Sequence, residues 1–409
     1  MTPSQPTTFE DALVQIRSVL GELAKGAAER DVTREHPYRL VQDLAAAGFG
    51  RLRLARDVGG FDVDLPTLFA LLAEAGQADS NIPQIWRGHF TTTEILRRED
   101  DSSAKHYWSE RIAAGAVFGN AQSEPSSVVA GLESGDDWNP ISTRVRTDGR
   151  GRRVVSGTKF YSTGSRFADY IRTAVLDDEG SRRFVVIPAR HAGVDHVDDW
   201  DGIGQGQTGS GTTILTDVPV EPHGDLGRGV DSLRGLDSFV QIVHLANLAG
   251  IARSIVAETV DVVRARTRTS RHALSQTATD DPDVLAVIGR LHARRLTAEA
   301  LLDRAARRLE AAHSAGDEAS YADAYVETST CQVAVIEAVL DAATAAFDAG
   351  GSSTVRASVH LDRHWRNART LASHNPVIYK PRVTGDFLVN GNRPVSGYYA
   401  GRDTGKAES

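Results

Sequence analysis

The sequence contains almost no cysteine: Cys331 is the only one in 409 residues. A single thiol excludes an internal disulfide framework and argues against a metal site built from cysteines, so we predict no metal site. Runs of about 18 apolar residues are also missing, which argues against a membrane-spanning helix. The N-terminus lacks the basic and apolar regions of a signal peptide. We therefore expect a cytoplasmic protein that does not associate with membranes.

Lysine is scarce as well, and nearly all basic residues are arginine. The net charge of -8 at pH 7 argues against a surface that is basic overall, so we expect no binding to nucleic acid. The hydrophobic content of 41% and the charged content of 24% are ordinary for a globular protein. A chain of this length is expected to form two or three domains.

The chain divides into three sections by the period of its apolar residues. The first, from residue 9 to about 115, has the three- and four-residue spacing of helices. The second, from 117 to about 222, has short β-branched and aromatic runs that indicate an antiparallel sheet or barrel. In the third, the helical period returns over roughly 236–268, 281–313, 318–348 and 357–372. We predict an N-terminal helical domain (1–115), a central β-domain (116–230) and a C-terminal helical bundle (231–409).

The most informative motif is the turn 160–165, Phe-Tyr-Ser-Thr-Gly-Ser, between two apolar runs. The small residues Ser162, Thr163 and Gly164 place hydroxyls and backbone N–H groups at one point. Small side chains let backbone donors approach a ligand closely. The turn is therefore suited to hold a polar planar ligand.

This turn resembles the central β-domain of the acyl-CoA dehydrogenase superfamily. Its sequence is closer to the monooxygenase branch typified by dibenzothiophene monooxygenase than to the dehydrogenases. Three further stretches carry the same resemblance, which covers nearly the whole chain: 118–124, 198–205 and 364–370. The resemblance implies an α+β fold with an N-terminal helical domain, a central antiparallel β-domain and a C-terminal four-helix bundle.

The resemblance also implies a flavin, reduced FMN or reduced FAD. In the family, the stretch after residue 118 and the turn lie against the flavin ring, and the glycine-rich loop 202–211 lies by its ribityl and phosphate groups. An arginine at the end of the first C-terminal helix binds the phosphate in the family; of Arg264, Arg266 and Arg268 we choose Arg268. From the residues alone, these features also fit a self-capped strand end, a surface hairpin loop and a solvated helix end. The predicted cofactor-binding residues are Asn120, Gln122, Ser123, Tyr161, Ser162, Thr163, Trp200, Gln205, Thr208, Ser210, Arg268 and Arg369.

Three residues are predicted to be catalytic: His89, Ser162 and His374. By the resemblance, His89 lies in an early helix near the substrate, and His374 lies in the loop that joins the last two helices and closes over the flavin. A lone histidine is more often structural, so these roles depend on the resemblance. Dibenzothiophene enzymes have two histidines three residues apart in that loop, and Leu371 stands at the first position here.

The sequence lacks the base that a dehydrogenase needs. Removal of the proton α to a thioester requires a carboxylate, which the family takes from the C-terminal loop or from the helix that contains Gln241. Residues 350–406 contain no glutamate, and residues 238–250 contain no carboxylate. Asp362 and Asp386 belong to helical segments. The same absence disfavours a nitroalkane oxidase.

We therefore predict a two-component flavin-dependent monooxygenase. Reduced flavin and O2 would form a C4a-hydroperoxyflavin, which oxygenates an apolar heteroatom-containing or aromatic small molecule at sulfur, nitrogen or carbon. No NAD(P)H motif is visible, so a separate NAD(P)H:flavin reductase would supply the reduced flavin. The resemblance also implies a homotetramer. The alternatives are an FAD-dependent acyl-CoA dehydrogenase and a non-catalytic flavin-binding homologue.

Overall fold

The N-terminal section folds into helices, as its apolar period predicts. The computed structural model describes residues 6–125, 141–227 and 233–394. Polar side chains cap three of these helices, because Thr8, Asp64 and Ser102 each accept a hydrogen bond from the backbone N–H three residues on. The helices are α1 (Phe9–Thr33), α2 (Tyr38–Ala46), α3 (Leu65–Ala78), α4 (Asn81–Arg98) and α5 (Ser103–Ala113).

The C-terminal section is helical too, with boundaries that differ from those predicted. Its helices are α8 (Leu236–Ala265), α9 (Pro282–Ala315), α10 (Glu318–Gly350), α11 (Asp362–His374) and α12 (Lys380–Asn390). The prediction that the first helix reaches residue 268 is wrong: Arg266 is its extended C-cap and donates to the carbonyl oxygen of Ala349 (2.7 Å). The prediction of a helix from 357 is also wrong, since His360 has a positive φ of 56° that interrupts it.

The central section forms one seven-stranded sheet within the described residues, in the order β1-β4-β2-β3-β7-β6 with β5 beside β4. Most pairings are antiparallel, as predicted, but β1 pairs with β4 in parallel, and one parallel bridge joins β2 to β4. A connection of about 50 residues separates β1 from β4, which is long enough for the crossover that parallel strands need. The strands are β1 (Phe118–Ala121), β2 (Arg144–Thr147), β3 (Arg153–Lys159), β4 (Tyr170–Leu176), β5 (Arg182–Pro188), β6 (Val194–His196) and β7 (Thr213–Pro219).

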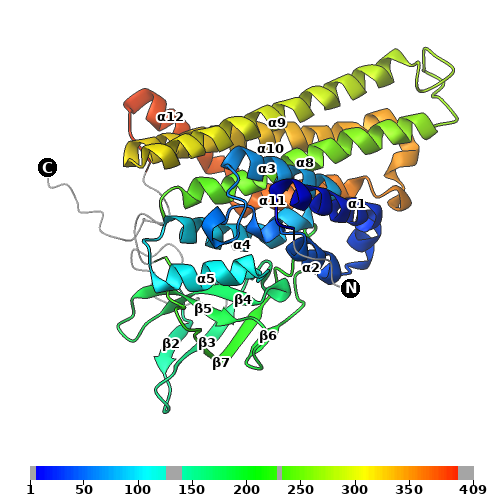
Figure 1. Cartoon of the computed structure of the whole chain (residues 1–409). Helices are drawn as coiled ribbons and strands as arrows, with labels where there is room; N and C mark the ends of the chain where they lie inside the picture. Colours follow the sequence, from blue (N-terminus) through cyan, green and yellow to red (C-terminus); the bar gives the residue numbers. More distant parts are fainter. Residues whose placement is uncertain (1–5, 126–140, 228–232, 395–409) are drawn as a thin grey trace.

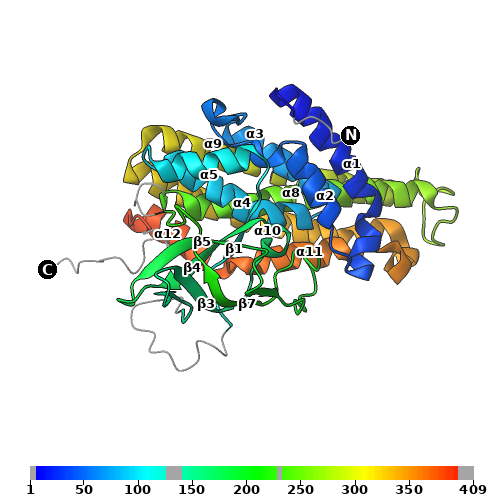
Figure 2. The same cartoon turned by 60° about the horizontal axis from the view of Figure 1, so that its bottom comes forward.

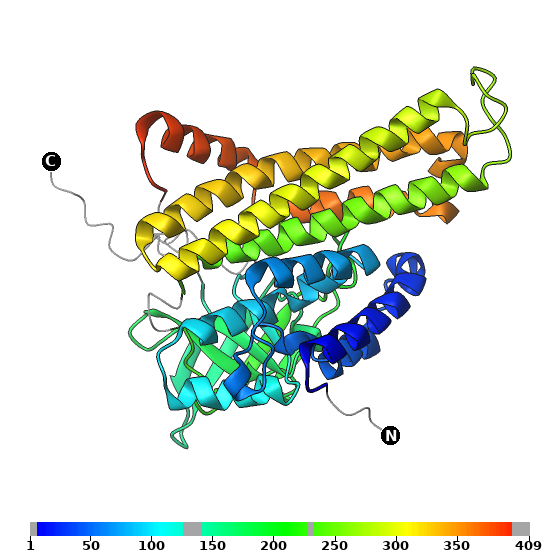
Figure 3. The same ribbon diagram turned by 45° about the horizontal axis from the view of Figure 1, so that its top comes forward.

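The helices and the sheet form layers, with α4 in the middle. Figure 1 shows the sheet at the bottom, α3 and α4 above it, and the long helices α8, α9 and α10 at the top. Helix α4 contacts both β1 and α8, and Figure 2 shows α4 beside α8. Helices α9 and α10 lie side by side (Figure 3). Residues of α4 therefore face the sheet on one side and α8 on the other.

Two helical segments, Leu236–Ala265 and Glu318–Val355, are long and apolar enough to cross a membrane by length and composition alone. Core helices of globular proteins pass the same test. In α8 the most apolar stretch is 89% buried inside the fold, so its apolar character is explained by packing.

Candidate active site

The turn 160–165 joins the end of β3 to β4 and has an unusual backbone. Tyr161 has a positive φ of 57°. This backbone conformation is unfavourable for residues other than glycine and is often found at functional sites. Next to it, Ser162 is 1% exposed, and its hydroxyl oxygen is buried without a hydrogen-bond partner in the described residues. A buried hydroxyl without a partner is a donor available to a ligand.

The turn contains two aromatic residues, which lie near a third aromatic ring. The rings of Phe160 and Tyr161 are 4.6 Å apart, and the Tyr161 ring is 5.9 Å from that of Trp200. Tyr161 is 52% exposed. An exposed aromatic surface beside a free hydroxyl is suited to a flat ligand with polar edges.

The glycine loop 202–211 packs against the turn and uses its hydroxyls internally. Gly164 N–H donates to the carbonyl oxygen of Thr208 (3.0 Å). The Ser210 hydroxyl bonds those of Thr163 (2.8 Å) and Thr208 (2.7 Å), and Thr208 also donates to the carbonyl oxygen of Gln205. The three hydroxyls already have partners in the protein, so their role in cofactor binding stays a prediction.

Two glutamines fasten the glycine loop to the helices. The backbone N–H of Gln205 and its side-chain amide both donate to Oδ1 of Asn367 on α11, at 2.6 and 3.2 Å. Gln207 donates to the carbonyl oxygen of Arg30 on α1 (2.7 Å) and bonds Asn81 at the start of α4. Gln205, predicted to flank the flavin, therefore first serves to anchor this loop. Gln207, Asn81 and Asn367 were not predicted.

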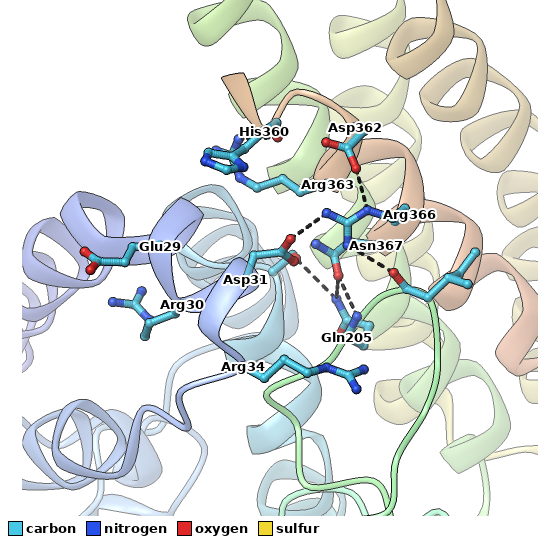
Figure 4. A network of polar contacts seen from close by, with 12 residues as sticks. Glu29, Arg30, Asp31, Arg34, Gln205, His360, Asp362, Arg363, Arg366 and Asn367 are labelled. Carbon is cyan, nitrogen blue, oxygen red and sulfur yellow. Dashed lines mark hydrogen bonds and ion pairs between the residues drawn. The ribbon is translucent and has the colours of Figure 1, made fainter. Parts of the chain in front are cut away.

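An ion-pair cluster reinforces this attachment (Figure 4). The guanidinium of Arg366 on α11 donates to Asp31 of α1 (2.5 Å), to the carbonyl oxygen of Ile203 (3.1 Å) and to Asp362 (2.7 Å). We call these four residues the Arg366 cluster. It joins the N-terminal helix, the glycine loop and α11 at one point.

A buried ion pair lies directly before the turn. Lys159, the last residue of β3, bonds Glu124 at 2.9 Å, and both side chains are fully buried. The Glu124 carboxylate also accepts from the backbone N–H and hydroxyl groups of Ser142 and Thr143. Burial opposes its ionisation, but Lys159 and these donors prevail and lower the pKa of Glu124 to about 2. Burial lowers the pKa of Lys159 to about 8.

The three residues predicted along the flavin at the end of β1 are half-buried. Asn120 is paired with Arg172 of β4, and its side chain lies against Gly88 of α4. Ser123 accepts from the N–H of Phe160 at the start of the turn (3.0 Å). The strand end and the turn are thus joined. The flavin contacts of Asn120, Gln122 and Ser123 stay predictions.

His89 is fully buried in α4, and the protein uses both of its ring nitrogens. Nε2 donates to the carbonyl oxygen of Gly50 (2.8 Å), and Nδ1 accepts from the N–H of Phe118 (3.2 Å). Burial lowers the pKa of His89 to about 4, so the ring is neutral at pH 7. This arrangement fits a structural tie between β1 and the segment around Gly50, and the catalytic role stays a prediction.

His374 is the last residue of α11. The prediction that it lies in the loop after this helix is therefore wrong by one residue. His374 is exposed, yet desolvation by the surrounding protein lowers its pKa to about 3, with a further effect of the Arg87 charge. Its ring lies 4.3 Å from that of His244 on α8. Leu371 is buried in the helical core. His244 was not predicted, because a histidine among apolar helix residues resembles a core position.

The predicted arginines differ in availability. Arg268 lies beyond α8 and is exposed, whereas Arg264 pairs loosely with Asp261 at 3.9 Å. Arg369 on α11 donates to the Ser373 hydroxyl (3.3 Å). The phosphate contacts of Arg268 and Arg369 stay predictions.

The two aspartates considered as alternative bases have other partners. Asp362 accepts from Arg366 within the Arg366 cluster, and Asp386 accepts from Asn390 (2.7 Å) and Asn392. Asp362 is exposed and Asp386 is half-buried. Among the described residues, the charged group that affects the pKa of both His244 and His374 is the cation Arg87.

The residues of the turn fit a flavin. The buried hydroxyl of Ser162 lacks a partner within the described ranges, and it lies beside aromatic rings that a flat ring system can contact. His374 is partly exposed and neutral at pH 7. The turn therefore offers a donor for a ring edge and a surface for a ring face, and a role of His374 at the same site stays a prediction.

Comparison with known proteins places this site in a family context. Residues 242–378 match the family model described as acyl-CoA dehydrogenase, C-terminal domain. The chain is 28% identical over 406 residues to dibenzothiophene monooxygenase of Rhodococcus qingshengii, covering 95% of each chain. It is 28% identical over 411 residues to the probable FMNH2-dependent monooxygenase SfnC of Pseudomonas putida, covering 98% of each. The structure of methanesulfinate monooxygenase MsuC from Pseudomonas fluorescens superposes with a TM-score of 0.84 at 25% identity, over 95% of this chain and 99% of that one.

These comparisons confirm the predicted acyl-CoA dehydrogenase fold and the predicted resemblance to the monooxygenase branch. They also confirm the prediction of an enzyme of the oxidoreductase class.

Proposed function

We propose that this protein is a two-component monooxygenase that uses reduced FMN and O2. The proposal is supported by its acyl-CoA dehydrogenase fold and by its resemblance to flavin-dependent monooxygenases over nearly its whole length. FMN is favoured over FAD by the similarity to a probable FMNH2-dependent enzyme. The absence of an NAD(P)H motif in the sequence supports a separate reductase. The substrate is a small molecule with an oxidisable sulfur, nitrogen or ring carbon.

One observation carries the choice of monooxygenase over dehydrogenase. The described residues include two neutral donors, Ser162 and His374, while Asp362 and Asp386 already accept hydrogen bonds from Arg366 and Asn390. Proton abstraction needs a free carboxylate near the substrate. Oxygen transfer needs neutral donors that stabilise a developing negative charge on oxygen.

The chain's residues have distinct roles in this proposal. When bound, reduced flavin supplies two electrons, so that one oxygen atom of O2 enters the substrate and the other leaves as water. The Ser162 hydroxyl donates to a ring edge, and the rings of Tyr161 and Trp200 contact the ring system. His374 donates its N–H to the reacting oxygen. Arg268 holds the phosphate as a bidentate donor.

A homotetramer belongs to the same proposal. Several apolar side chains of the C-terminal elements are exposed in the single chain: Val355 (70%), Trp365 (38%), Ile378 (73%), Tyr379 (53%), Leu388 (73%) and Val389 (81%). Exposed apolar surface of this kind is typical of subunit interfaces. Light scattering is expected to give a mass near four times 44.0 kDa, and a stable monomer with full flavin affinity would contradict the proposal.

The test of the activity is a single-turnover reaction. Anaerobic protein with reduced FMN is mixed with O2 and with dibenzothiophene or methanesulfinate, and oxygenated product and hydrogen peroxide are measured. We expect product with one of them and less peroxide than from free reduced FMN. Complete conversion to peroxide with both, together with reduction of bound FAD by an acyl-CoA, would favour the dehydrogenase.

A further inference from the structure

His244 is a buried histidine, and apolar packing alone does not explain why a histidine stands at this position. It lies in the middle of α8 and is 2% exposed, and neither ring nitrogen has a hydrogen-bond partner among the described residues. Leaving a buried polar group without a partner costs about 1–3 kcal/mol. A leucine would fill the space without that cost, so the ring nitrogens need another explanation.

The His244 ring contacts a second ring that also has free nitrogens. Its centroid is 4.3 Å from that of His374, and the planes are inclined by 45°. His374 is exposed, and besides this ring contact it feels the charge of Arg87. Among the described residues, the four nitrogens of these two touching imidazoles have no hydrogen-bond partner, and one ring is buried while the other residue is exposed.

The packing of α4 against α8 determines what else faces this pair. The Asn247 amide donates to the carbonyl oxygen of Ser80 (2.7 Å), and Ile95 packs with Leu236, so the two helices run antiparallel. Arg87 on α4 consequently lies at the level of His244. Its charge adds to the effect of burial in lowering the pKa of His244 well below the ordinary value. Arg87 from α4 and His374 from α11 are the titratable groups of the described residues that face His244.

The covered position of His244 decides how it can act. Its nitrogens are buried, so a reacting molecule can reach His374 but not His244. A neutral imidazole has one N–H donor and one acceptor nitrogen. If His374 donates one N–H to a reacting oxygen, its other nitrogen is an acceptor, and the partner of that acceptor fixes the tautomer.

We propose that His244 is a positioning residue for His374. When the site is occupied, the two rings turn so that a His244 N–H donates to the inner ring nitrogen of His374. The outer nitrogen of His374 then carries its proton toward the reacting oxygen. This inference depends on the proposed function, because it assigns a role at that same site.

The first test is a crystal structure of the wild-type protein with oxidised FMN. We expect a nitrogen of each ring to approach to about 2.7–3.2 Å, the range of a hydrogen bond. Rings that stay inclined without a nitrogen–nitrogen contact would overturn this inference and leave the proposed function intact. Failure of FMN to bind in solution would overturn both.

The second test separates the ring nitrogens of His244 from its shape. His244→Phe keeps a flat ring without nitrogens, and His244→Gln keeps a polar nitrogen at a similar distance. In the reaction with the accepted substrate, His244→Phe should bind FMN normally but lower the product-to-peroxide ratio by up to about 10²-fold, the cost of a misplaced catalytic group. His244→Gln should restore most of the ratio. The exposed His292 on α9 gives the control, His292→Phe. A His244→Phe ratio equal to that of this control would refute a role for the nitrogens.

Discussion

The Arg366 cluster allows a quantitative prediction for the variant Arg366→Met. This change keeps much of the side-chain volume but leaves the Asp31 carboxylate without its cation. The Asp31 side chain is 7% exposed and that of Arg366 is 29% exposed. Breaking a fully buried pair costs about 3–5 kcal/mol, and the partial exposure of Arg366 lowers this to roughly 2–3 kcal/mol. The lost bonds to Ile203 and the exposed Asp362 add about 1 kcal/mol.

We therefore expect Arg366→Met to lower the free energy of unfolding by about 3–4 kcal/mol. The measurement is urea unfolding of the flavin-free protein at one fixed concentration, followed by circular dichroism. FMN affinity should fall as well, because the glycine loop loses one of its attachments to α11.

The matched control is Arg39→Met on α2. Arg39 also pairs with an aspartate four residues away, Asp43, but both side chains are exposed, at 77% and 40%. Such a pair contributes less than about 0.5 kcal/mol. In a double-mutant cycle, Asp31→Asn should remove most of the cost of Arg366→Met. The reasoning is wrong if Arg366→Met destabilises the protein no more than Arg39→Met does.

Three further predictions concern the turn and its surroundings. Ser162→Ala should leave the stability of the flavin-free protein within about 0.5 kcal/mol, since its hydroxyl has no partner among the described residues, and weaken FMN binding about 10-fold in fluorescence titration. Ser210→Ala, which loses two hydroxyl contacts, should instead destabilise the loop. Glu124→Gln should cost about 3 kcal/mol at pH 7. Because the pKa of Glu124 is lowered to about 2, its contribution is complete above its unfolded pKa, near 4.5, and declines as the pH falls toward 2, so wild-type and variant stabilities should converge there in acid-unfolding experiments. His374→Ala should bind FMN normally but lower product formation about 10²-fold and release more hydrogen peroxide, and an unchanged ratio would make His374 structural.

The helical and strand sections could be predicted because their apolar periods are strong. Helix α8 was placed correctly except at its end, where Arg266 bonds the end of α10. That bond depends on a residue 83 positions away, which local periodicity does not contain. The parallel pairing of β1 with β4 escaped prediction for the same reason, because period-2 alternation does not specify the partner of a strand.

The residues near the site could be predicted from the sequence, but the partners toward which their polar atoms point could not. The sequence placed Gln205 and Thr208 in the right loop, yet their polar atoms bond Asn367 and Ser210 inside the protein. Lys159 gave a weak signal, since a lysine inside an apolar strand requires a buried partner. That Glu124 is this partner could not be predicted, because the pairing depends on how the strands assemble into the sheet.

The Asp31–Arg366 contact has a consequence for folding. Its two residues are separated by 335 positions. At a synthesis rate of about 5–20 residues per second, α1 waits roughly 20–70 s for its partner helix α11. During that time the glycine loop also lacks its support from α11. Attachment of this loop to α11 is thus a late event in folding, and shortening the chain before α11 should leave the loop held to the helices through Gln207 but not through Gln205 or Ile203.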